Sequence, residues 1–229
     1  MWAKLVAGFS DIIQLFYNFT VQIGLPSYGL AIILLTIVIK MVLYPLTIKQ
    51  MMSIKGLKEI QPKIDEIKRK YHDKKDKMQE AIMQLYREHN VNPLAGCLPL
   101  LVQMPFLIAL YQALLHFNYI NPSHARFFWI QNLSEPDPWI IPILAGLTTW
   151  WQQKVSMVSP NDPNQKMMLI FMPLFLFWIA RSIPAGLGLY WVVFSVVGAI
   201  QQIIINRQVR PIPVPAVEGR NKKEDRNKK

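Results

Sequence analysis

Long apolar stretches separated by charged segments are the feature of this 229-residue sequence that most limits its fold. Hydrophobic residues make up 52% of the chain and charged residues 17%, whereas an average soluble domain has about 25% charged residues. A helix needs about 20 apolar residues to cross a bilayer. Five segments are predicted to span a membrane: residues 23–48, 92–117, 138–155, 166–181 and 184–206. The predicted fold is an all-α integral membrane protein with five transmembrane helices.

The residues between these spans are predicted to form smaller units. Residues 1–22 have apolar side chains at helical spacing, which predicts an amphipathic helix at the membrane interface. In residues 49–91, isoleucine and leucine recur every three or four positions on both sides of a polar turn at 72–77. That pattern indicates a cytoplasmic helical hairpin between the first and second spans. The rest is predicted as an extracytoplasmic loop at 118–137, a cytoplasmic loop at 156–165 and a disordered basic tail at 207–229.

The distribution of lysine and arginine predicts the orientation of the spans. The formal net charge is +11, and the hairpin and the tail are both rich in basic residues. The loop after the third span adds Lys154 and Lys166, whereas the opposite side has only Lys4, Arg126 and Arg181. Because short cytoplasmic loops are enriched in basic residues, the expected orientation is N-out and C-in.

Lys40 is the most informative single residue, because it lies near the middle of the first predicted span. A lysine at the centre of a bilayer costs roughly 2.5–3.5 kcal/mol and usually faces a bundle interior or a water-filled cavity. None of the five segments contains an aspartate or glutamate that could pair with it. An unpaired cation at this depth predicts a hydrated cavity.

Other polar and aromatic residues in the spans are candidates to line that cavity. Each of the polar ones has an alternative role in a hydrogen bond between helices, and the two aromatic residues have one in the interfacial aromatic belt. The candidates are Gln103, Gln152, Gln153, Tyr190, Trp191, Ser195, Gln201 and Gln202.

The sequence offers no arrangement for covalent catalysis. The spans contain no paired aspartates, no serine–histidine set and no HExxH motif, and the chain has no Walker A motif. One cysteine, Cys97, can form neither an internal disulfide nor a structural zinc site. We therefore expect no catalytic residues, no metal, no cofactor and no enzymatic activity.

Three segments resemble the YidC/Oxa/Alb family of membrane protein insertases. They are NPLAGCLPLLVQMPFLIALYQAL at 92–114, FMPLFLFW at 171–178 and IPAGLGLYWVVFSVVGAIQQ at 183–202. The resemblance extends over roughly residues 24–207 and is closest to the short bacterial type. It implies a multi-pass protein of the bacterial plasma membrane with five spans and a hairpin after the first.

The resemblance also implies a site and a set of partners. It predicts a groove open to the cytoplasm and to lipid, with Lys40 where most bacterial members have arginine, an exchange that keeps the charge but loses the forked guanidinium. Trp191 matches the groove aromatic residue, and either Gln152 or Gln153 matches a groove glutamine. The implied partners are nascent membrane proteins, the ribosome through the tail and hairpin, the Sec translocon and anionic lipids.

Two other functions are compatible with parts of the pattern. A small-solute transporter or channel would need a polar path open to both sides and usually an internal repeat, and neither is visible here. A non-catalytic assembly factor for already inserted proteins would use the same groove, and the sequence does not separate it from an insertase.

Overall fold

The computed structural model describes residues 2–89, 91, 98–117, 120–157 and 163–208, without the side chains of 53–55, 98–103 and 163–164. The secondary structure of these residues is helical, with no β-strand, as the predicted fold class requires. The predicted tail lies outside the described residues from position 209 onward, and so does Cys97. The helices are α1 Trp2–Gln22, α2 Tyr28–Val42, α3 Tyr44–Lys70, α4 Lys75–Glu88, α5 Leu98–Leu115, η2 Pro122–Ala125, α6 Ile140–Ser156, α7 Pro163–Ala180 and α8 Ala185–Gln208.

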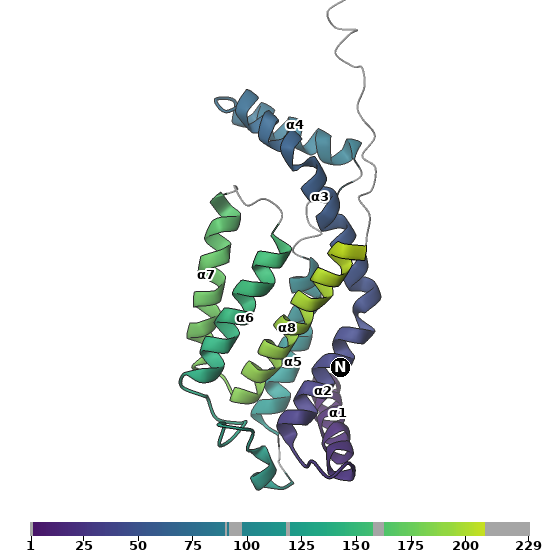
Figure 1. Ribbon diagram of the computed structural model, residues 1–229, viewed down its shortest axis with the longest axis vertical. Coiled ribbons are helices and arrows are strands. Elements are labelled where there is room, and N and C mark those ends of the chain that lie inside the picture. The colour runs from purple at the N-terminus through teal and green to yellow at the C-terminus, as the bar shows by residue number, and fades with distance from the viewer. Residues whose placement is uncertain (1, 90, 92–97, 118–119, 158–162, 209–229) are drawn as a thin grey trace, which may run out of the picture.

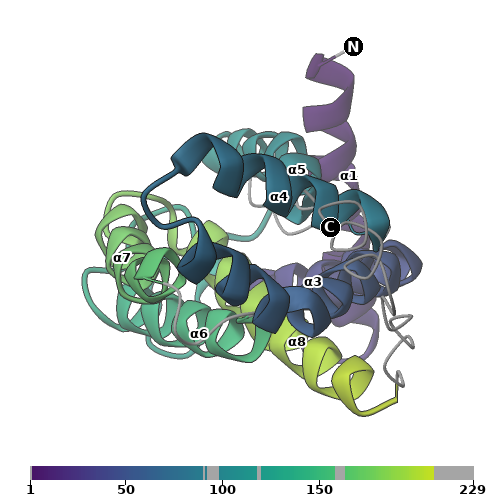
Figure 2. The same cartoon turned by 90° about the horizontal axis from the view of Figure 1, so that it is seen from above.

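Helix α8 occupies the centre of the bundle, with α6 on one side and α2 on the other (Figure 1). Helix α7 packs on the far side of α6, and α1 packs between α2 and α5. Helices α3 and α4 lie across one end of the bundle, as the view from above shows (Figure 2). This order brings α2, α6 and α8 together, although they are far apart in the sequence.

The first predicted span is divided by a break at Leu43. The amide of Leu43 still donates to the carbonyl of Ile39 at 2.9 Å, but α3 then starts with Pro45 in its first turn and departs from α2 by 56°. Proline has no amide proton, and its ring clashes with the carbonyl four residues earlier, here that of Met41. The helix therefore ends at Val42, before the predicted boundary at 48. Lys40 consequently lies in the last turn of α2, just before the bend.

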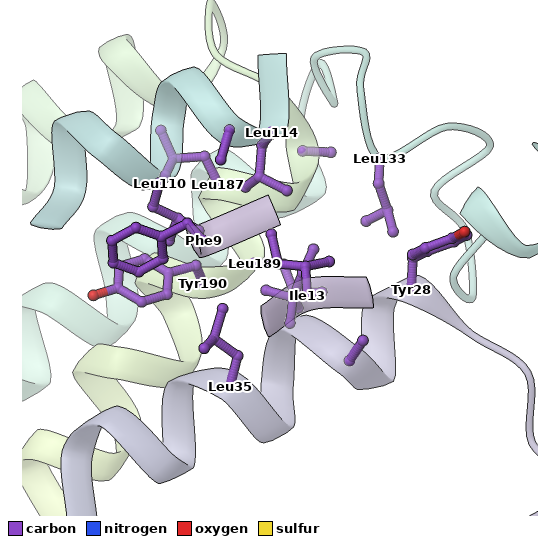
Figure 3. Close-up of a cluster of buried hydrophobic side chains, with 14 of the residues drawn as sticks. Phe9, Ile13, Tyr28, Leu35, Leu110, Leu114, Leu133, Leu187, Leu189 and Tyr190 are labelled. Carbon is purple, nitrogen blue, oxygen red and sulfur yellow. The ribbon is translucent and has the colours of Figure 1, made fainter. Parts of the chain in front are cut away.

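The main hydrophobic core joins α1, α2, α5 and α8 (Figure 3). Phe9 and Ile13 of α1 are buried in it beside Leu110 and Tyr190. The ring of Tyr17 stacks on Tyr28 with 3.9 Å between centroids. One face of α1 is thus part of the bundle, while its other face, with Leu5 and Ile12 among others, is exposed. A location of α1 at the membrane interface remains a prediction.

A second, small core joins α3 to α4. Ile60 and Ile64 of α3 and Leu85 of α4 are buried against one another, with Ile67 and Ile82 at the margin. These are the positions whose spacing predicted a helical pair, and α3 ends within one turn of the predicted polar turn. The outer faces of both helices are charged and exposed.

The outer surface of the bundle is strongly apolar. Within the described residues, Ala185–Arg207 is the single straight helix long and apolar enough to cross a bilayer, and the bent pair of α2 and α3 qualifies if counted as one span. Met104–Leu115 and Gln165–Ala180 are apolar but shorter. Helix α7 exposes a dense set of large apolar side chains, namely Met167, Met168, Ile170, Phe171, Leu174, Phe175, Trp178 and Ile179.

Two glycines allow a matched test of the packing between α6 and α8. A methyl group at Gly188 would overlap the side chain of Ile141, whereas one at Gly8 of α1 would have no atom within 4 Å. Gly188→Ala should lower the stability by about 1–3 kcal/mol through overpacking. Gly8→Ala should raise it by up to about 1 kcal/mol through helix propensity. Thermal unfolding in detergent micelles measures both; a Gly188→Ala protein that melts at or above the wild-type temperature would contradict this packing.

Candidate functional site

Lys40 is buried although it is a lysine, and it lies where α2 meets α8. Only 6% of its surface is exposed. Its ammonium nitrogen lies 3.3 Å from the centroid of the Phe194 ring of α8. Such cation–π contacts contribute about 2 kcal/mol when the cation is desolvated. The aromatic face is thus a direct stabilising contact for the buried charge.

Gly198, one turn beyond Phe194, leaves the space in which the ammonium group lies. A Cβ atom at this glycine would be 3.0 Å from Nζ of Lys40 and 2.5 Å from Nε2 of Gln152 on α6. The absence of a side chain on α8 therefore brings a cation from α2 and an amide from α6 to the same place. Both nitrogens are hydrogen-bond donors, so together they can bind one anionic group such as a carboxylate.

Lys40 has no anionic partner within the part of the chain that the structure describes. No carboxylate oxygen of those residues lies within 4.0 Å of its Nζ, and the ion pair found there, His72 with Asp73, is in the turn between α3 and α4. A buried charge costs several kcal/mol unless it is paired, and one aromatic contact offsets only part of that. The site is therefore electrostatically suited to attract an anion.

A polar stripe on α8 continues from this point along the helix. Gln201 donates from Nε2 to the backbone carbonyl of Lys40 at 3.3 Å, while its Oε1 is buried and has no hydrogen-bond partner among the described residues. The hydroxyl of Ser195 is also buried and without a partner. Buried polar atoms are usually satisfied. Those two oxygens add unused hydrogen-bonding capacity to α8, and Gln201 is in contact with the backbone of Lys40.

Trp191 connects the same stripe to α6. Its indole Nε1 donates to Oγ1 of Thr149 at 2.9 Å. Thr149 and Gln152 are three residues apart and therefore share one face of α6. The hydrogen bond holds the α6 face that includes Gln152 against α8.

The sequence-predicted residues thus divide into groups. The structure places Lys40, Gln152, Trp191, Ser195 and Gln201 along the contact of α2, α6 and α8. Gln153 is half-buried next to Gln152, but no contact joins it to Lys40. Tyr190 belongs to the main hydrophobic core (Figure 3). The side chain of Gln103 lies outside the described residues.

Phe194, Gly198 and Thr149 were not predicted from the sequence. Along α8, Phe194 comes three residues after Trp191, Gly198 four residues after Phe194, and Gln201 three residues after Gly198. A helical projection through Trp191 would have placed all of them on one face. Thr149 had no such signal, because its role depends on how α6 packs against α8.

The described residues form no group that could hold a metal ion. The side chains at the Lys40 site are a cation, amides, a hydroxyl and aromatic rings, which bind without forming covalent bonds. The arrangement can therefore attract and hold an anionic or polar segment between apolar helices.

Comparisons with known proteins agree with the resemblance seen in the sequence. The family model described as 60Kd inner membrane protein matches residues 19–211. A membrane protein insertase YidC of Geobacter metallireducens is 43% identical over 185 residues, which is 80% of this chain and 34% of that protein. A membrane protein insertase YidC of Haemophilus influenzae is 43% identical over 209 residues, which is 90% of this chain and 37% of that protein. The chain thus spans about a third of the length of these relatives.

A solved structure agrees as well. The crystal structure described as an active YidC insertase with the first transmembrane domain resolved has a TM-score of 0.69 and 26% sequence identity. The match covers 89% of this chain and 46% of that one. The family model extends over most of the chain and includes every helix of the Lys40 site. This chain belongs to the 60Kd inner membrane protein family, the YidC/Oxa/Alb family that its sequence resembles.

Proposed function

We propose that this chain is a membrane protein insertase and chaperone that moves nascent membrane proteins into the bilayer without covalent chemistry. The observation that supports this most directly is the buried Lys40 ammonium, which has an aromatic and an amide neighbour but no carboxylate among the described residues. Relatives at 43% identity are named membrane protein insertases. An unpaired buried cation is costly, so its presence favours a role in binding.

The substrate groove is proposed to follow the polar stripe at the contact of α2, α6 and α8. Lys40, Gln152, Trp191, Ser195 and Gln201 would line it. Gln103, Gln153 and Tyr190 are retained as secondary candidates. The groove is proposed to be hydrated and open to the cytoplasm and to lipid, so that a polar segment can enter without complete loss of water.

The proposed mechanism is electrostatic first and hydrophobic second. Carboxylates of a short acidic segment in the substrate are attracted to Lys40, and the attraction grows as the local dielectric constant falls. A membrane potential assists an acidic segment by about 2.3 kcal/mol per charge per 100 mV. The apolar helix of the substrate then moves into lipid past the exposed apolar surface of α7. Burial of that helix in lipid provides the final driving force.

We propose a five-span arrangement in the bacterial plasma membrane, N-out and C-in. The spans would be α2 with the start of α3, then α5, α6, α7 and α8. Helices of 17 or 18 residues, such as α6 and α7, are about 26 Å long. They are short for a hydrocarbon core of about 30 Å and would thin the bilayer locally.

The cytoplasmic partners are proposed to meet the chain at α3 and α4. These helices lie across one end of the bundle with charged outer faces (Figure 2). Ribosomes would dock there and on the basic tail, and anionic lipids would attract the same basic residues. Insertion is proposed to proceed with or without the Sec translocon.

The orientation can be tested by cysteine labelling in a Cys97→Ser chain. Lys77 of α4 and Glu135 of the connection between α5 and α6 are both exposed, and α4 and this connection lie at opposite ends of the bundle (Figure 1). Lys77→Cys should react with an impermeant maleimide only in inside-out vesicles, and Glu135→Cys only in right-side-out vesicles. Reaction of both positions from the same side would contradict the arrangement.

The role of Lys40 can be tested by reconstitution in proteoliposomes with one purified single-span substrate. Lys40→Ala should reduce insertion of a substrate with an acidic leading segment about tenfold, because one charge-assisted interaction of about 1.5 kcal/mol is lost. Lys40→Arg should retain most activity. A substrate with asparagine and glutamine in place of its acidic residues should be affected little by either change. Normal insertion of the acidic substrate by Lys40→Ala would refute the proposal.

Gly198→Ala tests whether the position of the cation matters as well as its presence. The added methyl group would displace the flexible ends of Lys40 and Gln152, not backbone, so thermal stability should change little. Insertion of the acidic substrate should fall about three- to tenfold, as expected if about 1 kcal/mol of attraction is lost. Gly8→Ala is the matched control, since its methyl group would meet no atom within 4 Å. Equal loss for acidic and neutral substrates would indicate a general packing defect and contradict the positioning role.

A further inference from the structure

The connection between α5 and α6 has features that insertion through the Lys40 groove does not use. It includes η2 and a tight turn, and lies at the end of the bundle opposite α3 and α4 (Figure 1). The turn is closed by two hydrogen bonds between Phe127 and Ile130, from the Phe127 amide at 2.9 Å and from the Ile130 amide at 2.8 Å. The two residues at its tip are Phe128 and Trp129.

The tip residues are unusual for a turn of this kind. Phe128 has a φ angle of 50°, in the left-handed region where two-residue turns usually place asparagine or glycine. Its side chain is nevertheless 83% exposed, although its ring meets those of its chain neighbours Phe127 at 4.7 Å and Trp129 at 6.1 Å between centroids. Trp129 is fixed differently, because its indole donates to Asp137 at 3.1 Å. A strained, exposed phenylalanine at a fixed turn favours a contact outside the fold.

A cavity of about 580 Å³ lies beside this turn. Its lining combines polar and apolar surface and includes Arg126, Gln131 and Asn132. Within the described residues, neither Arg126 nor Gln131 has a hydrogen-bonding or ionic partner. Volumes of 300–1,000 Å³ are typical of small-ligand sites, and a free guanidinium with an adjacent amide is suited to a phosphate group.

The two carboxylates of this connection, Glu135 and Asp137, form no ion pair with Arg126 among the described residues. Asp137 accepts hydrogen bonds from Trp129 and from the backbone amides of Trp139 and Ile141 at the start of α6. Glu135 accepts one from Asn132 at 3.0 Å. Both carboxylates thus have other hydrogen-bond donors, and Arg126 is exposed and open to an external anion.

The two ends of the α5–α6 connection expose apolar and aromatic side chains. Ile120 is 73% exposed, and Trp139 and Ile140 at the start of α6 are also exposed. The guanidinium of Arg181 lies 4.5 Å from the Trp139 ring. Exposed aromatic residues combined with arginine are typical of the level at which lipid headgroups meet acyl chains.

We propose that the cavity lined by Arg126 and Gln131 binds the phosphate group of a membrane phospholipid, while Phe128 on the adjacent turn enters the acyl-chain boundary. The site would fix this end of the bundle at the headgroup level of one leaflet. It does not depend on insertion activity, because the residues concerned are separate from the Lys40 groove.

Lipid binding can be measured by native mass spectrometry of the full chain in detergent, titrated with phosphatidylglycerol. Arg126→Gln should weaken the tightest binding event about tenfold, as expected for loss of one charged hydrogen bond. Arg87→Gln removes the same charge from the exposed surface of α4, at the other end of the bundle, and is the control; it should change the affinity less than twofold. Millimolar inorganic phosphate should not displace the lipid.

Two results would contradict the proposed phospholipid site. Equal affinities of wild type and Arg126→Gln would show that the cavity does not hold the headgroup. Displacement by inorganic phosphate at low concentration would show a site for soluble anions instead.

The position of Phe128 can be measured by fluorescence in phosphatidylglycerol and phosphatidylcholine vesicles. An environment-sensitive label on Phe128→Cys, in a Cys97→Ser chain, should be quenched by lipids with a nitroxide on the upper acyl chain and not by aqueous cobalt. The same label on Lys77→Cys should show the opposite pattern, since Lys77 is on the charged outer face of α4. Quenching of the label at position 128 by cobalt would contradict membrane entry. A label that neither agent quenches, as expected if a protein partner covers the turn, would also contradict it.

Discussion

A positive charge held between apolar helices, with no carboxylate beside it in the described structure, is the constraint around which the rest of the site is arranged. Such a charge is expensive to bury. The protein reduces the cost with the face of Phe194 and provides space for the ammonium group at Gly198. Those contacts leave the positive field available to an incoming anion, which an aspartate or glutamate in the same place would cancel.

The packing of three helices surrounds Lys40 with the other residues of the site. Helix α8 contacts both α2 and α6, so Lys40 and Gln152 meet although they are more than a hundred residues apart. The hydrogen bond from Trp191 to Thr149 fixes the rotation of α6 that faces Gln152 toward α8. The break at Leu43 ends α2 soon after Lys40, which places the cation next to a bend and close to the polar helices α3 and α4.

The sequence was sufficient to predict the helical class, and it singled out Lys40 as the candidate that the structure then shows to be buried. Apolar run length and charge segregation identified the helical segments, and the missing carboxylates singled out Lys40. The break at Leu43 was not predicted, because hydropathy continues through Leu46 whereas Pro45 interrupts the hydrogen-bond ladder locally. The choice between Gln152 and Gln153 also required the structure, since adjacent residues on a helix differ by about 100° in direction.

Gly198 illustrates what a sequence alone cannot show. A glycine in an apolar helix is compatible with close packing, flexibility or no function. The role of Gly198 becomes clear only in the structure. The terminal groups of Lys40 from α2 and Gln152 from α6 lie in the space that a Cβ atom would fill. Phe194 is similar, because an aromatic residue in a membrane helix is ordinary until a cation is found over its ring.

The most direct measurement of the central claim is a charge reversal in reconstituted vesicles. A Lys40→Glu chain would be paired with a single-span substrate whose leading acidic residues are replaced by lysine, and all four combinations of chain and substrate would be assayed without a membrane potential. If attraction between Lys40 and substrate carboxylates drives entry, each single reversal lowers insertion and the double reversal restores much of it. The two single reversals, if they acted independently, would lower insertion by the product of their separate factors. An insertion level for the doubly reversed pair no higher than that product would contradict the account.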